Sequence, residues 1–150
     1  MANIFTSART AMIAAFEADA GIAAEVRTWR TFGAGLRKRL IIEPAWCPVL
    51  AVYPASVSED PRYNAAKDTD QELWIRIVDF GHDPSTAEEI LARVLERIDA
   101  LRQTALGLTD DGCKDIRAGV ARWDPTPDES GANVIWDVVL PITIKWTLFT

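Results

Sequence analysis

The clearest pattern in the chain lies near its C-terminus, where every even-numbered position from 134 to 148 carries an apolar residue. The odd positions are more polar and include Asp137, Thr143, Lys145 and Thr147. Apolar residues at every second position predict a β-strand with one face in the core. At about 3.3 Å per residue this strand would reach roughly 50 Å, well beyond a typical strand of a small domain.

The length of this strand leaves two alternatives open. Pro141 lacks the N–H that a ladder hydrogen bond needs, so the strand could bend there into two pieces. In the other alternative, the far half leaves the domain and buries Ile144, Trp146 and Leu148 against another copy of the chain. The C-terminus would then be an assembly device.

The first 30 residues have a helical pattern. Residues 6–20 are rich in alanine, with Met12 and Phe16 one helical turn apart, which predicts an amphipathic helix. After Gly21, apolar residues at helical spacing predict a second short helix or a kinked continuation of the first. These residues are Ile22, Val26 and Trp29. The glycines and the proline within residues 33–44 predict mostly loop.

Two strands are predicted in the middle of the chain. Residues 48–53 form a short apolar run between two prolines, which is typical of a buried strand. In residues 72–80, Ile75 and Ile77 share one face and Trp74 lies on the other. The polar segment 55–71 is expected to be a connection of about 17 residues, which is long enough to be functional or disordered.

The most regular helical pattern covers residues 85–102, where apolar residues form one stripe and Glu and Arg residues line the opposite side. Ser85 and Glu88 have the spacing of a capping box, which predicts the start of the helix. Gly and Asp residues then break the pattern. A third strand is predicted over residues 114–123, and a wide turn leads from it to the C-terminal strand.

These elements predict one α+β domain that spans residues 1–150. Its N-terminal helical segment covers residues 6–30, and its sheet-and-helix body covers residues 47–150. The expected sheet is mainly antiparallel, has four strands and packs against the helix at 85–102. A chain of 150 residues with 49% hydrophobic content is sufficient for one continuous core.

The composition and the N-terminal sequence indicate in which cell compartment the protein is expected. No apolar stretch is long enough to cross a membrane, and no basic region followed by an apolar block begins the chain, so neither a membrane span nor a signal peptide is expected. Cys47 and Cys113 lack the spacing of metal ligands and are too few for a disulfide framework. We expect a cytosolic chain with free thiols.

The net charge argues against nucleic-acid recognition. With a net charge of −6, the domain should be repelled by nucleic-acid phosphates unless its basic groups gather on one face. The one dense basic run, Arg37-Lys38-Arg39, is interpreted as a solvated loop.

Few residues are candidates for catalysis. His82 follows a strand and precedes a helix, where a lone histidine is usually structural or solvated rather than a general base. The acidic groups at 68–70 and 110–112 fit turns better than a cation site, because the further acidic ligands of a calcium loop are missing. No glycine-rich phosphate loop occurs. No catalytic residue, metal ligand or cofactor is therefore predicted.

Six tryptophans are the remaining unusual feature. A tryptophan in a strand is usually part of the core, but at an interface it acts as an anchor, and both interpretations stay open. We hypothesise a contact between copies of the chain. Its residues are Trp74, Trp136, Ile142, Ile144, Trp146 and Leu148.

The order of these elements resembles that of tail-terminator and tail-completion (head-tail joining) proteins of long-tailed bacteriophages. The features that carry the resemblance are the segment Cys47-Pro48-Val49-Leu50-Ala51-Val52-Tyr53-Pro54, the long polar connection after it and the long C-terminal hairpin. The resemblance extends over nearly the whole chain and includes no diagnostic motif.

This resemblance implies a structural protein of a phage or prophage virion, present in the host cytoplasm during assembly. It implies a homo-hexameric ring that caps the tail tube and joins it to the head connector, with DNA passing through without specific binding. Such proteins carry no catalytic residues. We further hypothesise that the segment 55–71 contacts the tube or the connector. The residues assigned to this contact are Glu59, Asp60, Arg62, Tyr63 and Lys67.

Two alternatives belong to other functional classes. The first is a monomeric module that binds a small molecule or peptide in an apolar pocket between the sheet and the helix at 85–102. The second is a hydrolase with a site around His82 and Asp83. The mass of the chain in solution distinguishes an assembling ring from a monomeric binder.

Overall fold

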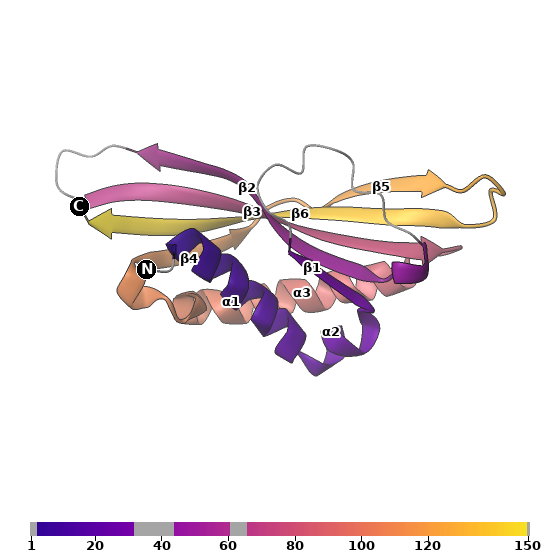
Figure 1. The fold of residues 1–150 in the computed structure, drawn as a ribbon, viewed down its shortest axis with the longest axis horizontal. Helices are drawn as coiled ribbons and strands as arrows, with labels where there is room; N and C mark the ends of the chain where they lie inside the picture. The colour runs from indigo at the N-terminus through magenta and orange to yellow at the C-terminus, as the bar shows by residue number, and fades with distance from the viewer. Residues whose placement is uncertain (1–2, 32–43, 61–65, 150) are drawn as a thin grey trace.

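In the computed structural model, the described residues are 3–31, 44–60 and 66–149, and they form a six-stranded sheet with helices against one of its faces (Figure 1). The strands are β1 (Thr28–Thr31), β2 (Val49–Asp60), β3 (Ala66–Gly81), β4 (Cys113–Ala118), β5 (Arg122–Pro127) and β6 (Val134–Phe149). The helices are α1 (Ile4–Ala18), α2 (Ala20–Glu25) and α3 (Ser85–Thr104), with short 3-10 turns at Pro44–Trp46, Ala105–Gly107 and Thr109–Asp111.

The sheet is mixed, which corrects the expectation of a four-stranded, mainly antiparallel sheet. Its strand order is β1-β2-β3-β6-β4, and β5 also pairs with β6. β1 runs parallel to β2, and the other pairs are antiparallel. Trp29 belongs to β1 rather than to the second helix, which ends at Glu25. A strand of four residues is too short for its alternation to outweigh a helical spacing.

The long C-terminal strand stays within the domain. β6 and β3 both have 16 residues and pair along their whole length, from Gly81 opposite Val134 to Ala66 opposite Phe149. The alternative in which the far half of β6 leaves the domain is wrong, because Ile144 and Trp146 are buried in the chain's own core. The partner that was missing from the sequence interpretation is the first half of β3.

That half of β3 lies in the segment that was expected to be a loop. β2 continues to Asp60 and β3 begins at Ala66, so most of residues 55–71 form a β-hairpin, with a bulge between Pro54 and Ser56. The expected loop is therefore wrong for this part. The reason is the polar character of both hairpin strands, which hides the period of two that a buried strand shows.

Pro141 neither bends nor ends β6. Proline has no N–H to donate, and the side of Pro141 where an N–H would lie faces a gap in the neighbouring strand. The Pro141 carbonyl accepts a hydrogen bond from the Gly119 N–H at 2.7 Å. Since the N–H and C=O of a strand residue point to the same side, the Pro141 nitrogen also faces residues 119–121, between β4 and β5. The single strand predicted over 114–123 is thus two strands along the same edge of β6.

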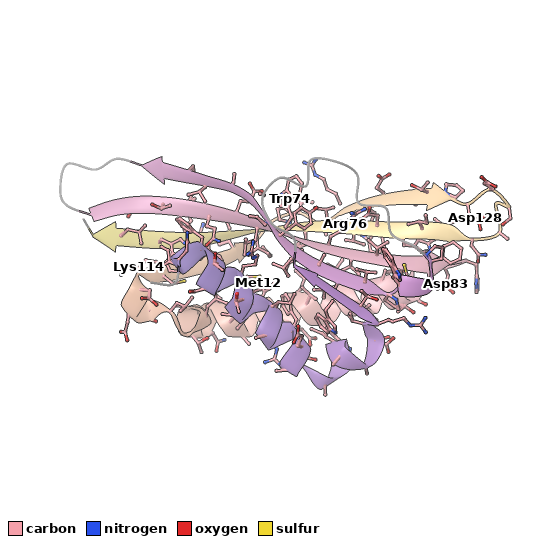
Figure 2. The ribbon with its side chains drawn as sticks, viewed as in Figure 1. Met12, Trp74, Arg76, Asp83, Lys114 and Asp128 are labelled. Carbon is pink, nitrogen blue, oxygen red and sulfur yellow. The ribbon has the colours of Figure 1, made fainter. Side chains whose placement is uncertain are left out.

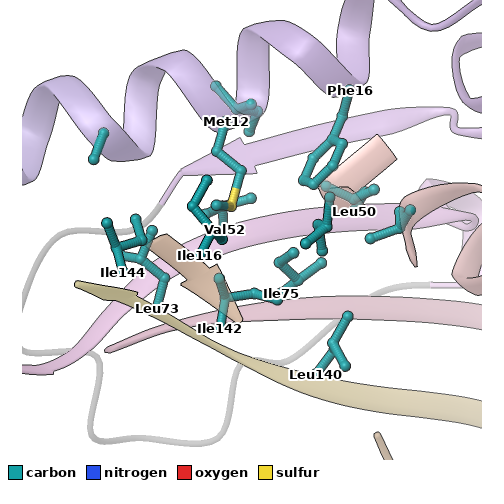
Figure 3. Packing of buried hydrophobic residues seen from close by; sticks show 14 of the residues in the cluster. Met12, Phe16, Leu50, Val52, Leu73, Ile75, Ile116, Leu140, Ile142 and Ile144 are labelled. Carbon is teal, nitrogen blue, oxygen red and sulfur yellow. The ribbon is translucent and has the colours of Figure 1, made fainter. Parts of the chain in front are cut away.

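The core fills the space between the sheet and the helices. Figure 3 shows Met12 and Phe16 of α1 directed at buried residues of β2, β3 and β6, among them Val52 and Ile75. From α3, the buried residues Ala87, Ile90, Val94 and Ile98 join the same cluster. The side chains of the chain itself fill most of this space, and a groove of about 460 Å³ between α3 and β4 is lined by the charged residues Asp99, Arg102 and Arg117 as well as by apolar ones.

A buried glutamine fastens the start of α1 to the sheet. The Gln71 Nε2 donates to the Phe5 carbonyl at 3.0 Å, and the Gln71 Oε1 accepts from the Trp146 Nε1 at 3.0 Å. The Phe5 and Trp146 rings also meet edge to face, with centroids 6.4 Å apart. One amide therefore joins α1, β3 and β6.

Asp19 fastens the corner between α1 and α2 to α3. Its Oδ1 accepts the N–H groups of Gly21 and Ile22 at 3.0 and 3.1 Å, and its Oδ2 accepts the Arg97 Nη2 at 2.8 Å. The hydrogen bond from Arg97, followed by the one from Ile22, lowers the pKa of the Asp19 carboxyl. One carboxylate thus caps α2 and binds a helix that lies far away in the sequence.

α3 begins at Ser85, as predicted, but with a different cap. The Asp83 carboxylate accepts the backbone N–H and the hydroxyl of Ser85 at 2.9 and 2.6 Å. The reciprocal bonds of a Ser85–Glu88 capping box do not form.

Replacing Gln71 by Leu should destabilise the fold by about 1–3 kcal/mol, because the buried indole N–H of Trp146 loses its acceptor. Urea unfolding measures this change. In a Trp146→Phe background the donor is already gone, so the same replacement should cost clearly less. Ser58→Ala, on the exposed part of the hairpin, is the matched control. Equal costs of Gln71→Leu in the two backgrounds would contradict the network.

Asp19→Asn should lower the stability at neutral pH by about 1 kcal/mol, because the charged bond to Arg97 is lost. The folded pKa of Asp19 lies below its ordinary value of 3.8, so its stabilising effect is fully present above 3.8 and disappears as the pH falls through the lower, folded value. Unfolding curves of wild type and variant should therefore converge at acidic pH. Glu17→Gln, on the exposed side of α1, is the control.

Candidate interaction surface

The face of the sheet opposite the helices carries the candidate functional surface (Figure 2). Tyr53 of β2, Trp74 of β3 and Pro141 of β6 lie side by side there, since the strand register pairs Trp74 with both of the others. The rings of Tyr53 and Trp74 meet edge to face, with centroids 5.8 Å apart at 76°. Trp74 nevertheless remains 39% exposed.

Arg76 and Asp137 form an ion pair beside these rings. The Arg76 Nε lies 2.9 Å from Oδ1 of Asp137, and Nη2 lies 2.5 Å from Oδ2, so the contact is bidentate. The side chains are only 15% and 18% exposed. The hydrogen bond to Asp137 raises the pKa of Arg76, so the guanidinium stays charged. The pair holds a fixed position on a face that no described helix covers.

Polar pairs continue this surface along the hairpin. Glu72 accepts the Trp74 Nε1 at 3.2 Å and the Ser56 hydroxyl at 3.1 Å. Further along, the Lys145 Nζ lies 3.4 Å from the Asp70 carboxylate. The bond to Glu72 orients the exposed indole of Trp74.

We define the open-face patch as Tyr53, Glu72, Trp74, Arg76 and Asp137. Tryptophan, tyrosine and arginine are the residue types that dominate binding energy at protein interfaces. In this patch they are partly exposed and already held by neighbours, so a partner would meet them with little loss of side-chain entropy. The chemistry of the patch suits a protein surface.

Other reactive groups are dispersed. His82 is 84% exposed and lies 3.6 Å from Asp83. Asp110 and Asp111 form part of a short 3-10 turn. In the part of the chain that the structure describes, no group of three or more His, Cys, Asp or Glu residues could hold a metal ion. None of the described helices is long and apolar enough to cross a membrane.

Neither cysteine forms a disulfide, and both thiols are poorly reactive in the fold. Burial, the larger effect, and the nearby Asp79 charge raise the pKa of Cys47 to about 11. Burial likewise raises the pKa of Cys113, with a further contribution from Asp115. Both cysteines are thus protonated at neutral pH.

The residues assigned to a contact between copies do not lie on one surface in the structure. Ile142, Ile144 and Trp146 are at most 1% exposed within a single chain, so their assignment to a surface is wrong. Even positions of β6 face the helices, and α1 covers the far half. Trp136 and Leu148 are half-buried against the same core, and the Trp136 Nε1 donates to the Gly81 carbonyl at 3.2 Å. Trp74 is the member that lies on the open face.

The residues assigned to the tube or connector lie around the hairpin end. Glu59 and Asp60 end β2, and Lys67 is the second residue of β3. Arg62 and Tyr63 lie outside the described residues. The strands thus bring Glu59, Asp60 and Lys67 to one end of the sheet, although 55–71 is not one loop.

Sequence interpretation did not single out Tyr53, Arg76 or Asp137 as parts of a functional surface. Asp137 occupies a polar odd position of the C-terminal strand and Arg76 lies between two apolar residues, so each looked like an ordinary solvent-facing side chain. Their pairing depends on the register between strands that are 61 residues apart at this point.

Arg76→Met should destabilise the fold by on the order of 2 kcal/mol, because it leaves the Asp137 carboxylate partly buried without its partner. Replacing both members, with Arg76→Met and Asp137→Leu, should recover most of that loss, as measured by urea unfolding. The control is Arg117→Met, which removes an exposed pair with Asp115 and should cost less than about 1 kcal/mol. If the double variant is no more stable than the single, the pair is not a coupled unit.

Comparison with known proteins gives a likeness at the level of the fold. No protein-family model matches the chain, and no curated protein does. Among solved structures, the chain is similar to a chain from the "virion of native gene transfer agent (GTA) particle", with a TM-score of 0.57 and 14% identity. The likeness covers 91% of this chain and 93% of that one. At this level of identity it shows a shared fold over nearly the full length of both chains.

Proposed function

We propose that this protein is a structural component of a phage-type virion. The observation that carries the proposal is the shared fold with a chain of a gene transfer agent virion, over 91% of this chain and 93% of the other. Since the likeness covers nearly all of both chains, it concerns the whole architecture rather than one motif. We place the protein in the virion and, during assembly, in the host cytoplasm.

Within the virion, we propose that copies of the chain form a ring, a hexamer by the resemblance described above, that caps the tail tube and joins the head connector. DNA passes through without specific binding. The open-face patch supports a protein contact because it holds an exposed tryptophan among fixed polar groups. The hairpin end around Asp60 and Ala66 is the proposed contact with the tube or connector.

The proposed role is non-catalytic. His82 is solvent-exposed, and both cysteines have pKa values raised by burial, so none of them has the environment of an activated nucleophile or base. A monomeric binding module has less support, since the groove between α3 and β4 is lined by Asp99, Arg102 and Arg117 as well as by apolar residues and is not the apolar pocket that this alternative requires.

The direct test is the composition of purified particles. Tailed particles from the organism that encodes the chain should contain it, as detected by mass spectrometry, and a deletion strain should produce heads and tails that fail to join. Absence of the chain from purified particles, together with normal particles from the deletion strain, would refute the proposal.

Trp74→Glu should weaken assembly into the ring by at least about 30-fold, because a charge replaces an anchor worth roughly 2 kcal/mol. Native mass spectrometry, with and without particle tails as a template, measures the ring. Val57→Glu places the same charge at a residue that is 51% exposed on the other face of the hairpin, and should leave the ring intact. Equal effects of the two variants would remove the open-face patch from the interface.

A further inference from the structure

Hydrogen-bond directions in the sheet show which backbone groups point outward at its edges. The Pro141 carbonyl accepts the Gly119 N–H, so odd residues of β6 face β4 and β5, and even residues of β6 face β3. The two residues of an antiparallel pair either both face each other or both face away. The register therefore directs the even residues of β3 toward β2. The outward positions of the outer strands follow from the same rule.

The edge of the sheet formed by β4 and β5 is closed to a further strand. In β4 the N–H of Ile116 points outward, and the Asp115 Oδ1 accepts it at 2.9 Å. The Arg102 Nε of α3 donates to the same oxygen at 2.8 Å. In β5 the outward positions include Pro125 and Pro127, which have no N–H. Prolines and charged side chains at an edge prevent pairing with another strand.

The edge along the hairpin half of β2 is open (Figure 1). β1 pairs with β2 only over residues 49–52, and no described strand lies beside β2 beyond that point. A bulge after Pro54 shifts the register by one residue, so the even residues of β2 from Ser56 onward face β3. The backbone N–H and C=O groups of Val57 and Glu59 therefore point outward.

This open edge, which we call the hairpin edge, lacks the protection of the other. Val57 is exposed, and neither proline nor lysine occurs from Ala55 to Asp60. The outward groups lie two residues apart, which is the repeat of a strand ladder. An extended segment placed there would form about four backbone hydrogen bonds and would continue the sheet.

The open face beside the hairpin edge is acidic. Glu72 accepts the Ser56 hydroxyl at 3.1 Å and forms no ion pair with any described residue. Asp70 lies 3.4 Å from the Lys145 Nζ. Over residues 54–72 the sequence has five acidic residues and two basic ones. An added strand with lysine or arginine on this face would thus be attracted by opposite charge.

The other face of the hairpin edge favours apolar side chains. Val57 pairs with Gln71, whose amide donates to the Phe5 carbonyl, so the Val57 side chain lies on the side of the sheet where α1 begins. Ile4 and Phe5 at this end of α1 pack partly buried against the core. An apolar residue of an added strand next to Val57 would remove its exposed surface from water.

We infer that the hairpin edge binds an extended segment of a different protein, in which lysine or arginine on the open face alternates with apolar residues on the α1 side. A second copy of this chain fits poorly, because its hairpin edge would bring two acidic surfaces together and its β4–β5 edge is closed. The inference deepens the proposed contact of the hairpin with the tube or connector. It rests on the proposed function only for the source of the segment.

A synthetic peptide tests the inference on the full chain. The probe is a fluorescein-labelled peptide of about eight residues in which lysine and valine alternate, and fluorescence anisotropy measures its binding. Replacing every lysine by glutamate should weaken binding at least about tenfold. Equal binding of the two peptides, or no binding of the lysine–valine peptide at millimolar concentration, would overturn the inference.

Methylated backbone nitrogens distinguish strand addition from attraction between charges. Successive N–H groups of a strand point to opposite sides, so only the lysine nitrogens or only the valine nitrogens can face the hairpin edge. Methylating one of these two sets should abolish binding, and methylating the other should leave it within about threefold. Equal effects of the two sets would exclude strand addition.

Two proline variants test the same bonds from the side of the protein. Val57→Pro and Glu59→Pro each remove one outward N–H without breaking the ladder to β3, so each should weaken peptide binding at least about fivefold. Val57→Ile keeps the N–H and the apolar side chain, and is the matched control. Thermal melting must show each variant folded. If one of them unfolds, the other variant and the methylated peptides still decide.

Hydrogen exchange followed by NMR locates the site. In the free chain the amides of Val57 and Glu59 should exchange quickly, and the lysine–valine peptide should slow both. The amide of Ser58, which faces β3, should be slow in either state. Slow exchange of Val57 and Glu59 in the free chain would show that another segment already fills the edge. A second copy would be that segment if the protection rises with concentration, and either result would overturn the inference.

The peptide site and the proposed function fail separately. Trp74→Glu removes the proposed ring contact and should leave peptide binding unchanged. A chain that is absent from purified particles but binds the peptide would refute the proposed function and support the strand site. A chain that is present in particles but does not bind the peptide would refute the strand site alone.

Discussion

The pairing of β3 with β6 along 16 residues each is the constraint on which the rest of the structure depends. Neither strand could be so long alone, because an unpaired half would expose a row of backbone donors and acceptors. The shared length creates two regions of sheet. The start of α1 packs on the region that contains Trp146, α3 extends along the sheet as far as β4, and β4 and β5 divide the outer edge of β6 between them (Figure 1).

The two faces of this sheet are stabilised differently. The helix-facing side is a continuous apolar cluster, where burial contributes roughly 1.5–3 kcal/mol for each large side chain. The opposite side buries Val49, Ala51 and Val78 and adds fixed polar contacts, among them Arg76 with Asp137 and Glu72 with Trp74. A face ordered in this way keeps its shape in water and still presents aromatic surface, as a reversible protein contact requires.

Local sequence patterns predicted much of this architecture. The features that they did not predict depend on pairing between strands that are far apart in the sequence. Alternation identified the strand at 134–148, and the apolar stripe identified the helix from Ser85. The hairpin was missed because Ser56, Ser58 and Asp70 are polar on both sides of its turn, and its order depends on β6 and on Gln71 beneath α1.

The prediction of surface residues failed for a similar reason. Ile144 and Trp146 looked available to a partner because the sequence does not show that α1 packs over them. The position of Trp74 on the opposite face was predictable from the sequence, but the Arg76–Asp137 pair beside it was not.

The Gln71 amide also gives the hairpin a mechanical property. It bonds to the Phe5 carbonyl of α1 and to the Trp146 indole of β6, close to where the hairpin leaves the body of the domain. The hairpin therefore cannot swing away from the helical layer unless the hydrogen bond between Gln71 and Phe5 breaks. Any displacement of the hairpin would thus be felt at the start of α1.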